Sequence, residues 1–118
     1  MNDEIDRAAL RATIAVLKRF SQFDHKMQIS TVQTLLEVAE GKLRGDSVSV
    51  QDIEKRVGLQ SGTASRNVYY WGDGANGVTG AHQMVSIGFD PTDRRKRTIG
   101  LTAKGRTFLK DVFKSKEN

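Results

Sequence analysis

The sequence contains no cysteine, a single proline and no long apolar run. Without cysteine the chain has no disulfide, no cysteine-ligated zinc site and no thiol switch. Lys, Arg or Glu interrupts every apolar cluster within a few residues, so none approaches the roughly 20 residues of a membrane-spanning helix. The N-terminus opens on acidic residues, whereas a secretory signal opens on positive charge. We therefore expect a soluble, cytoplasmic protein without a membrane partner.

The sequence also has no pattern that is typical of an enzyme. The glycine-rich stretch 72–80 (GDGANGVTG) lacks the Lys-Ser/Thr ending of a phosphate-binding loop, the GxGxxG order and the spacing of a calcium loop. The two histidines, His25 and His82, have no carboxylate partners at metal-ligand spacing. We expect no catalytic residue, no metal and no cofactor, and the sequence assigns no role to 72–80.

Positive charge is confined to the second half of the chain. Residues 1–59 hold nine Lys and Arg against nine Asp and Glu, whereas residues 60–118 hold ten against five, which accounts for the whole net charge of +5. This asymmetry indicates an anionic partner for the second half. Charge alone leaves open the alternative of a solvated basic surface. The length of 118 residues favours a single domain over 1–118.

Residues 4–23 form a predicted helix with two adjoining apolar stripes. One stripe holds Ile5, Ala9, Ala12, Val16 and Phe20, and the other holds Leu10, Ile14 and Leu17. Two stripes exceed what a surface helix of a monomer needs. A partner helix from a second copy is the simplest explanation, so we expect a homodimer. A second amphipathic helix follows, capped by Ser30 and ending near Arg44.

Two short helices are predicted next. Ser49 is followed three residues later by Asp52, the spacing of a capping box, and Gly58 ends that helix after about two turns. The following helix begins at Gln60 or Ser61 and continues through Trp71, with Ala64 and Val68 on its inner side. Two short helices joined by a tight turn form a helix-turn-helix. We expect the outward side chains to be Ser61, Thr63, Ser65, Arg66 and Asn67.

A hairpin and a last helix complete the predicted order. Strands over 83–89 and 98–102 flank a turn that begins at Asp90-Pro91, and the basic residues 94–97 lie at the hairpin tip. Thr102 caps a helix over 102–115 whose inward residues are Phe108, Leu109, Val112 and Phe113. The fold class is mainly α with a small β-hairpin. It is a winged helix-turn-helix of about five helices and a two- or three-stranded wing, with its main lobe over 30–101.

The segment 48–111 resembles the DNA-binding lobe of the MarR family of winged-helix regulators. VSVQDIEKRVGLQSGTASR is similar to the family's bracing helix, turn and recognition helix, and DPTDRRKRTIGLTAKGRTFL is similar to its wing and following helix. Two features depart from the family pattern. The glycine-rich stretch lengthens the path to the wing, and Gln60 replaces the usual Ser cap, which would shift the cap to Ser61.

The resemblance implies DNA binding by a homodimer on an inverted repeat, most often as a repressor. It places one group of side chains at the major groove and the basic wing in the minor groove. The first group is Gln60, Ser61, Gly62, Thr63, Ser65, Arg66, Asn67 and Tyr70; the second is Arg94, Arg95, Lys96 and Arg97. Tyr69 is the alternative to Tyr70, and Asp93 is expected to pair with an Arg. A small-molecule effector of unknown identity is possible. The alternative function is a protein-binding adaptor or inhibitor.

Overall fold

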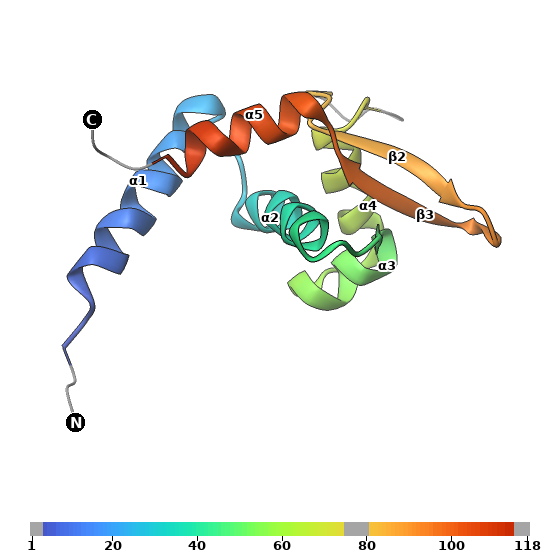
Figure 1. Cartoon of the computed structure of the whole chain (residues 1–118), viewed down its shortest axis with the longest axis horizontal. Helices are drawn as coiled ribbons and strands as arrows, with labels where there is room; N and C mark the ends of the chain where they lie inside the picture. Colours follow the sequence, from blue (N-terminus) through green and yellow to red (C-terminus); the bar gives the residue numbers. More distant parts are fainter. Residues whose placement is uncertain (1–3, 75–80, 115–118) are drawn as a thin grey trace.

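A helical body carries a protruding hairpin at one end (Figure 1). The computed structural model of the chain describes residues 4–74 and 81–114. Its elements in order are α1 (Arg7–Phe23), α2 (Ile29–Arg44), β1 (Val48–Ser49), α3 (Val50–Ile53), the π-helical turn η1 (Glu54–Gly58), α4 (Ser61–Trp71), β2 (Val85–Asp90), β3 (Asp93–Leu101) and α5 (Ala103–Val112). This order confirms the predicted winged helix-turn-helix fold, mainly α with a small sheet.

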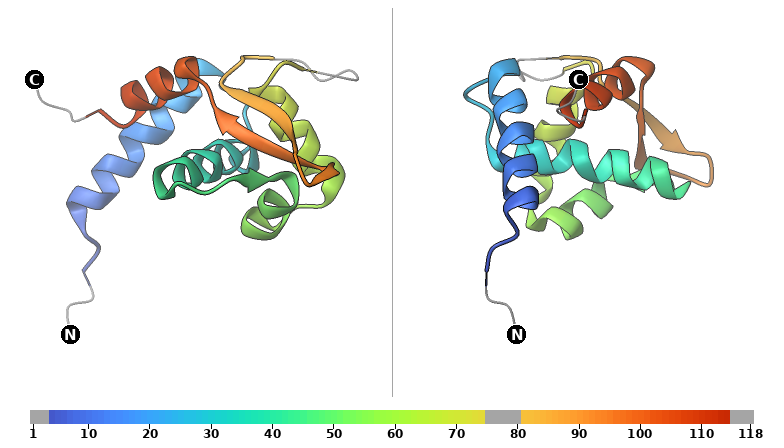
Figure 2. Two further views of the ribbon diagram at one scale, coloured as in Figure 1. Left: turned by 45° about the vertical axis from the view of Figure 1, so that its right-hand side comes forward. Right: turned by 60° about the vertical axis from the view of Figure 1, so that its left-hand side comes forward.

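Helix α1 projects from the body toward the N-terminus and lies beside α5 (Figures 1 and 2). It begins at Arg7 and not near Glu4, because the Asp6 carboxylate accepts a hydrogen bond from the Ala9 amide and caps it. Ile5 therefore precedes the helix and does not extend its apolar stripe. Phe20, near the other end, is buried in the core. The result is a helix that is anchored at its C-terminal end.

Helix α2 crosses the middle of the molecule and buries Leu35 and Val38. It begins at Ile29, so the prediction that Ser30 is its N-cap was wrong. Gln28 occupies the cap position without a side-chain hydrogen bond. The helix ends at Arg44, as predicted, because Gly45 adopts a left-handed conformation with φ of 80°.

The capping box predicted for α3 is present. The Ser49 hydroxyl accepts a hydrogen bond from the Asp52 amide at 3.1 Å, and the Asp52 carboxylate accepts one from the Ser49 amide at 2.9 Å. The helix then widens into η1, and Gly58, with φ of 84°, ends it at the predicted residue. This short unit packs against α4 and braces it.

We predict that this cap makes stability depend on pH. Hydrogen bonds from Ser49 hold the pKa of Asp52 below its usual value. The contribution of a carboxylate with a lowered pKa is present above the unfolded-state pKa of about 3.9 and is lost as pH falls through the folded-state pKa. Asp52→Asn should therefore lose stability less steeply than the wild type between about pH 5 and pH 2. Urea unfolding at stepped pH measures this, and equal slopes would contradict it.

The wing is a three-stranded antiparallel sheet of order β1-β3-β2. The tertiary pairing of β1 with β3 joins Val48 to Ile99 and Ser49 to Thr98. Strands β2 and β3 are both displaced from the predicted ranges, and β3 extends back to Asp93. The basic residues 94–97 therefore lie within β3 and not in the loop at the hairpin tip, which corrects the prediction.

Strand β3 carries a pronounced register irregularity. Phe89 pairs with Arg97, whereas the next residue on β2, Asp90, pairs with Asp93. The three residues between these partners on β3 are therefore extra: Arg94, Arg95 and Lys96. Such bulges bend a strand and re-aim its side chains. All three basic side chains are exposed.

The core lies where α1, α2, α4 and α5 meet. Trp71 is fully buried there, with its ring centroid 6.3 Å from Phe20 and 6.0 Å from Phe108. Thr102 caps α5, as predicted, by accepting a hydrogen bond from the Gly105 amide. Leu109 and Val112 are buried and Phe108 is half-buried, but Phe113 is 53% exposed, so its inward assignment was wrong. No helix within the described residues has the length and apolar character to cross a membrane.

Candidate nucleic-acid interface

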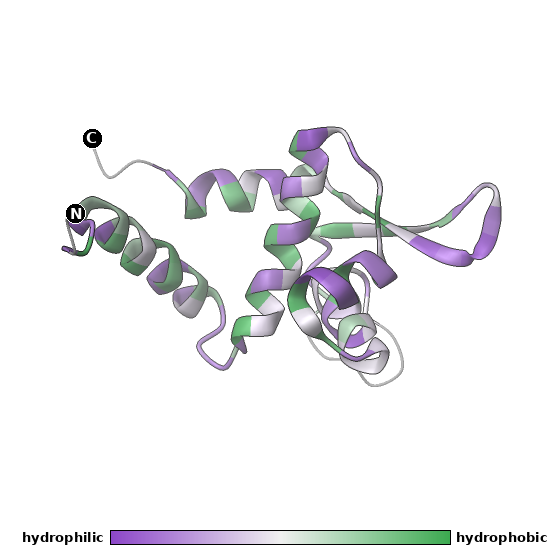
Figure 3. Cartoon of the chain, turned by 90° about the horizontal axis from the view of Figure 1, so that it is seen from below, coloured by the Kyte–Doolittle hydropathy of each residue, from purple (hydrophilic) through white to green (hydrophobic). Residues whose placement is uncertain are grey.

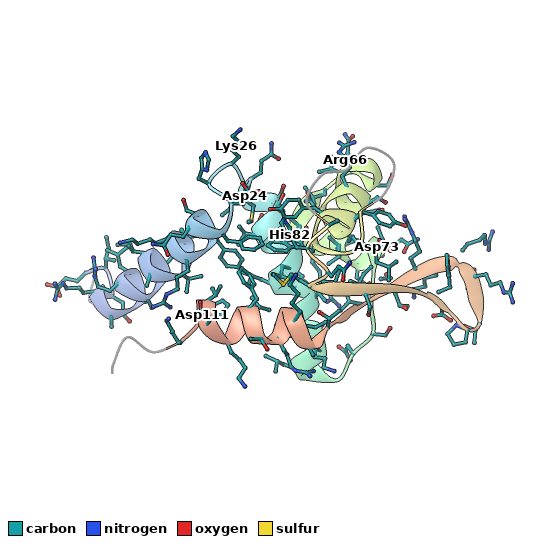
Figure 4. All side chains as sticks on the ribbon, turned by 90° about the horizontal axis from the view of Figure 1, so that it is seen from above. Asp24, Lys26, Arg66, Asp73, His82 and Asp111 are labelled. Atoms are coloured by element: carbon teal, nitrogen blue, oxygen red, sulfur yellow. The ribbon has the colours of Figure 1, made fainter. Side chains whose placement is uncertain are left out.

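Helix α4 presents one side to the core and the other to solvent. Ala64, Val68 and Trp71 are buried on the inner side. On the outer side Ser61, Gly62 and Arg66 are exposed, and Thr63 and Ser65 are half-buried. Figure 4 shows the Arg66 side chain pointing away from the body of the molecule. The N-terminal cap is Gln60, without a side-chain hydrogen bond, so the expected shift of the cap to Ser61 was wrong.

Asn67 is buried, which corrects its prediction as an outward residue available to DNA. It is 8% exposed and faces α2. Its side-chain oxygen accepts a hydrogen bond from the Thr31 hydroxyl at 3.1 Å, and its amide donates to the Thr34 hydroxyl at 3.3 Å. Trp71, one turn further along α4, donates from its indole nitrogen to the Thr31 carbonyl at 2.7 Å. These bonds fix the orientation of α4 on α2.

The tyrosine assignment also needs correction. Tyr70 points toward the corner between α1 and α2, where its hydroxyl donates to the Asp24 carboxylate at 2.6 Å. Burial and this carboxylate raise the pKa of Tyr70, and the same hydrogen bond lowers the pKa of Asp24. Tyr69, the alternative in the sequence analysis, is the tyrosine on the wing side of α4. Tyr70 is thus an unsuitable DNA contact, and Tyr69 replaces it in the candidate interface.

Arg97 connects the wing to α4. Its guanidinium donates to the Ser65 hydroxyl at 2.9 Å and to the Tyr69 hydroxyl at 3.2 Å, and it lies 5.7 Å from the centre of the Tyr69 ring. Arg97 was predicted at the hairpin tip as one of four equivalent basic side chains. Its contacts instead hold the inner face of the wing against the outer side of α4. Sequence spacing gave no signal for this pairing.

The other three basic residues of the wing have no comparable anchor. Arg95 pairs with Asp93, as expected, at 3.5 Å across an exposed surface. Arg94 and Lys96 are exposed beside it. Figure 3 shows this end of the hairpin coloured as strongly hydrophilic. Because a surface ion pair contributes little, these cations are available to an anion.

The candidate interface therefore combines two surfaces held at a fixed angle. One is the outer side of α4 around Arg66, and the other is the wing with its basic bulge. Arg97 joins them through Ser65 and Tyr69. A helix of this width fits the major groove of B-form DNA, and a hairpin beside it can reach the adjacent backbone and minor groove.

The histidines do not extend this interface. His82 lies among the rings of Phe23, Tyr70 and Trp71, and burial lowers its pKa. Figure 4 shows it in the interior, close to Asp24. Among residues 4–74 and 81–114 no three His, Cys, Asp or Glu side chains are grouped so that they could hold a metal ion. Residues 75–80 of the glycine-rich stretch lie outside the described residues.

Solved structures share this fold. No protein-family model matches the sequence, and no curated protein matches it significantly. A mutant of MepR from a multidrug resistant S. aureus clinical isolate superposes with a TM-score of 0.68 at 18% identity, over 98% of this chain and 79% of that one. A MepR-DNA complex gives 0.65 at 18%, over 90% and 78%. Bordetella bronchiseptica BpsR gives 0.57 at 21%, over 88% and 71%.

These likenesses establish the architecture. The chain has the winged helix-turn-helix fold of the MarR-family regulators. BpsR is described as a protein whose DNA binding is regulated by 6-hydroxynicotinic acid, and MepR as a transcription regulator of a multidrug efflux pump. At these identities the shared property is the fold.

Proposed function

We propose that this chain is a MarR-type transcription regulator that binds double-stranded DNA and catalyses no reaction. The observation that carries the proposal is the bridge from Arg97 to Ser65 and Tyr69, which holds a basic wing beside the exposed side of α4. The MepR-DNA complex, with a TM-score of 0.65, shows that a protein of this fold binds DNA. The excess of positive charge in residues 60–118 agrees with an anionic partner.

The two surfaces take different parts of the duplex in this proposal. Arg66, with its exposed guanidinium, reads base edges in the major groove, where Arg pairs with guanine. Ser61 and Thr63, at the first turn of α4, contact phosphates near the helix N-terminus. Arg94, Arg95 and Lys96 follow the minor groove and its phosphates. Asn67 and Tyr70 are excluded from the contact set by their internal hydrogen bonds.

We propose that the active form is a homodimer in the cytoplasm. Exposed apolar side chains follow one another along α1: Leu10 is 46% exposed, and Ile14 and Leu17 are each 43% exposed. Figure 3 shows these hydrophobic segments along the projecting helix. A second copy would cover them and would place two α4 helices on an inverted repeat about one helical turn apart. Repression follows when such a dimer occupies a promoter.

An effector remains part of the proposal because of a hollow at the α1–α2 corner, lined by Leu17, Phe20, Ser21, Asp24, His25, Met27, Ile29 and Val32. It adjoins the Tyr70–Asp24 hydrogen bond, and Tyr70 belongs to α4. A ligand there would act on the orientation of the DNA-binding helix. The sequence analysis suggested Trp71 as a pocket residue, but that ring is buried in the core.

The test is selection from a pool of random duplex DNA at two salt concentrations, followed by affinity measurement on the enriched sequence. We expect an enriched inverted repeat. Arg66→Ala should weaken binding by about 10- to 100-fold and relax the preference at one base pair of each half-site, because a bidentate base contact contributes about 1–3 kcal/mol. Arg11→Ala, an exposed arginine on α1, is the matched control and should bind normally.

The outcomes separate the candidate functions. Salt-sensitive binding without an enriched motif would indicate a non-specific architectural role and not a regulator. A folded protein that binds no duplex at low salt would refute DNA binding. The alternative in that case is a winged-helix adaptor or inhibitor that binds another protein, whose binding would tolerate loss of both Arg66 and the wing arginines.

A further inference from the structure

Phe89 is a large apolar side chain in an unexpected position, near the end of the wing. It is 64% exposed, although it belongs to a regular part of β2. Its cross-strand partner is Arg97, and paired residues of an antiparallel ladder share one face of the sheet. Arg97 contacts α4. Phe89 therefore lies on the face of the wing that is turned toward α4.

This face has an apolar stripe that continues past the protein body. Alternate residues of β2 lie on it, and their exposure rises along the strand: Val85 is 5% exposed, Ile87 is half-buried and Phe89 is 64% exposed. Val85 and Ile87 pair with Leu101 and Ile99 and pack on the core. Over the described part of the chain, Phe89 is thus the end of the stripe that the body leaves largely uncovered.

The surroundings of Phe89 are cationic. Phe89 and Arg94 line a shallow hollow with Asp90 and Pro91, and Arg97 is directly opposite on β3. The Asp90 carboxylate accepts hydrogen bonds from the amide and the hydroxyl of Thr92. A second wing would bring a second set of cations to this site and repel it. The occupant should instead be anionic and carry apolar surface close to its charges, as the alternating phosphates and deoxyriboses of DNA do.

We infer that Phe89 packs against the deoxyribose wall of the minor groove while the adjacent basic residues bind the phosphates. The inference rests on the proposed function and adds to it an apolar contact on the wing. An aromatic ring that becomes buried gains free energy without neutralising a phosphate. Its contribution to affinity is therefore independent of salt, whereas that of each basic neighbour is not.

Salt dependence is the test. The affinity of the full chain for its enriched duplex is measured by fluorescence anisotropy at four salt concentrations. Phe89→Ala should weaken binding about 10-fold at each concentration and leave the slope of log K against log salt unchanged. Arg95→Ala should make the slope shallower by about 0.9. Leu43→Ala, an apolar side chain that is 87% exposed on α2, is the matched control and should change neither quantity.

Each other result overturns part of the argument. Wild-type affinity in Phe89→Ala refutes the inference and leaves the proposed function standing. A shallower slope in Phe89→Ala would show that the ring acts only by placing cations. A change in sedimentation of the Phe89→Ala protein without DNA would show that the ring joins two copies of the chain. Absence of wild-type binding refutes the proposed function itself. Circular dichroism checks that each variant is folded.

Discussion

Trp71→Ala is expected to lower the free energy of unfolding by about 3–5 kcal/mol, a large share of the total for a domain of this size. Trp71 is fully buried between Phe20 of α1, Phe108 of α5 and the body of α2. Its indole N–H also satisfies the carbonyl of Thr31. Truncation therefore creates a cavity where four helices meet and leaves a buried acceptor without its partner.

Urea unfolding followed by circular dichroism measures this loss, because Trp71 is the only tryptophan in the chain and the variant has no tryptophan fluorescence. Trp71→Phe keeps an aromatic ring and removes the N–H, so it should cost less than the alanine variant. Leu43→Ala, on the surface, should unfold like the wild type. A cost below about 1 kcal/mol for Trp71→Ala would show that the four helices are not joined by this cluster.

Local signals in the sequence predicted much of the fold. The spacing of Ser49 and Asp52 located a helix start, and the same two residues form the capping box in the structure. Gly58 and Thr102 marked the end of one helix and the start of another for equally local reasons. Such signals can be predicted because both hydrogen-bonding partners lie within a few residues of each other.

Asn67 shows where single-residue chemistry was misleading. A polar side chain on a candidate recognition helix was expected to face solvent. Its spacing from Ala64 and Trp71, three and four residues away, places it instead on the inner side of α4. Burial is possible because Thr31 and Thr34 of α2 provide hydrogen-bonding partners. The helical spacing was visible in the sequence, but these partners were not.

The wing shows the second limit. The basic run 94–97 was identified from the sequence, but its four members were treated as equivalent. The register of β3 separates them: Arg97 stays in the ladder opposite Phe89 and bonds to α4, whereas the three residues before it form the bulge. Register depends on pairing between strands. The division of labour among these cations therefore required the structure.

That division gives the largest expected effect on DNA binding. Replacing Arg94, Arg95 and Lys96 together by alanine should weaken binding on the order of 100-fold at low salt and make the salt slope shallower by about 0.9 per lost phosphate contact. The fold should be unaffected, because all three side chains are exposed and Arg97 keeps the wing on α4. Anisotropy on the selected duplex across salt concentrations measures both quantities.

A control of equal charge separates a placed contact from general attraction. Alanine at Arg7, Arg11 and Lys18 removes three exposed cations from α1 and lowers the net charge of +5 by the same three units. Long-range attraction depends on total charge, so it would weaken binding similarly in both variants. Phosphate contacts made by the wing would leave the α1 variant close to the wild type. Equal losses in the two triple variants would therefore refute the wing as a DNA-binding element, whatever the protein's affinity for DNA.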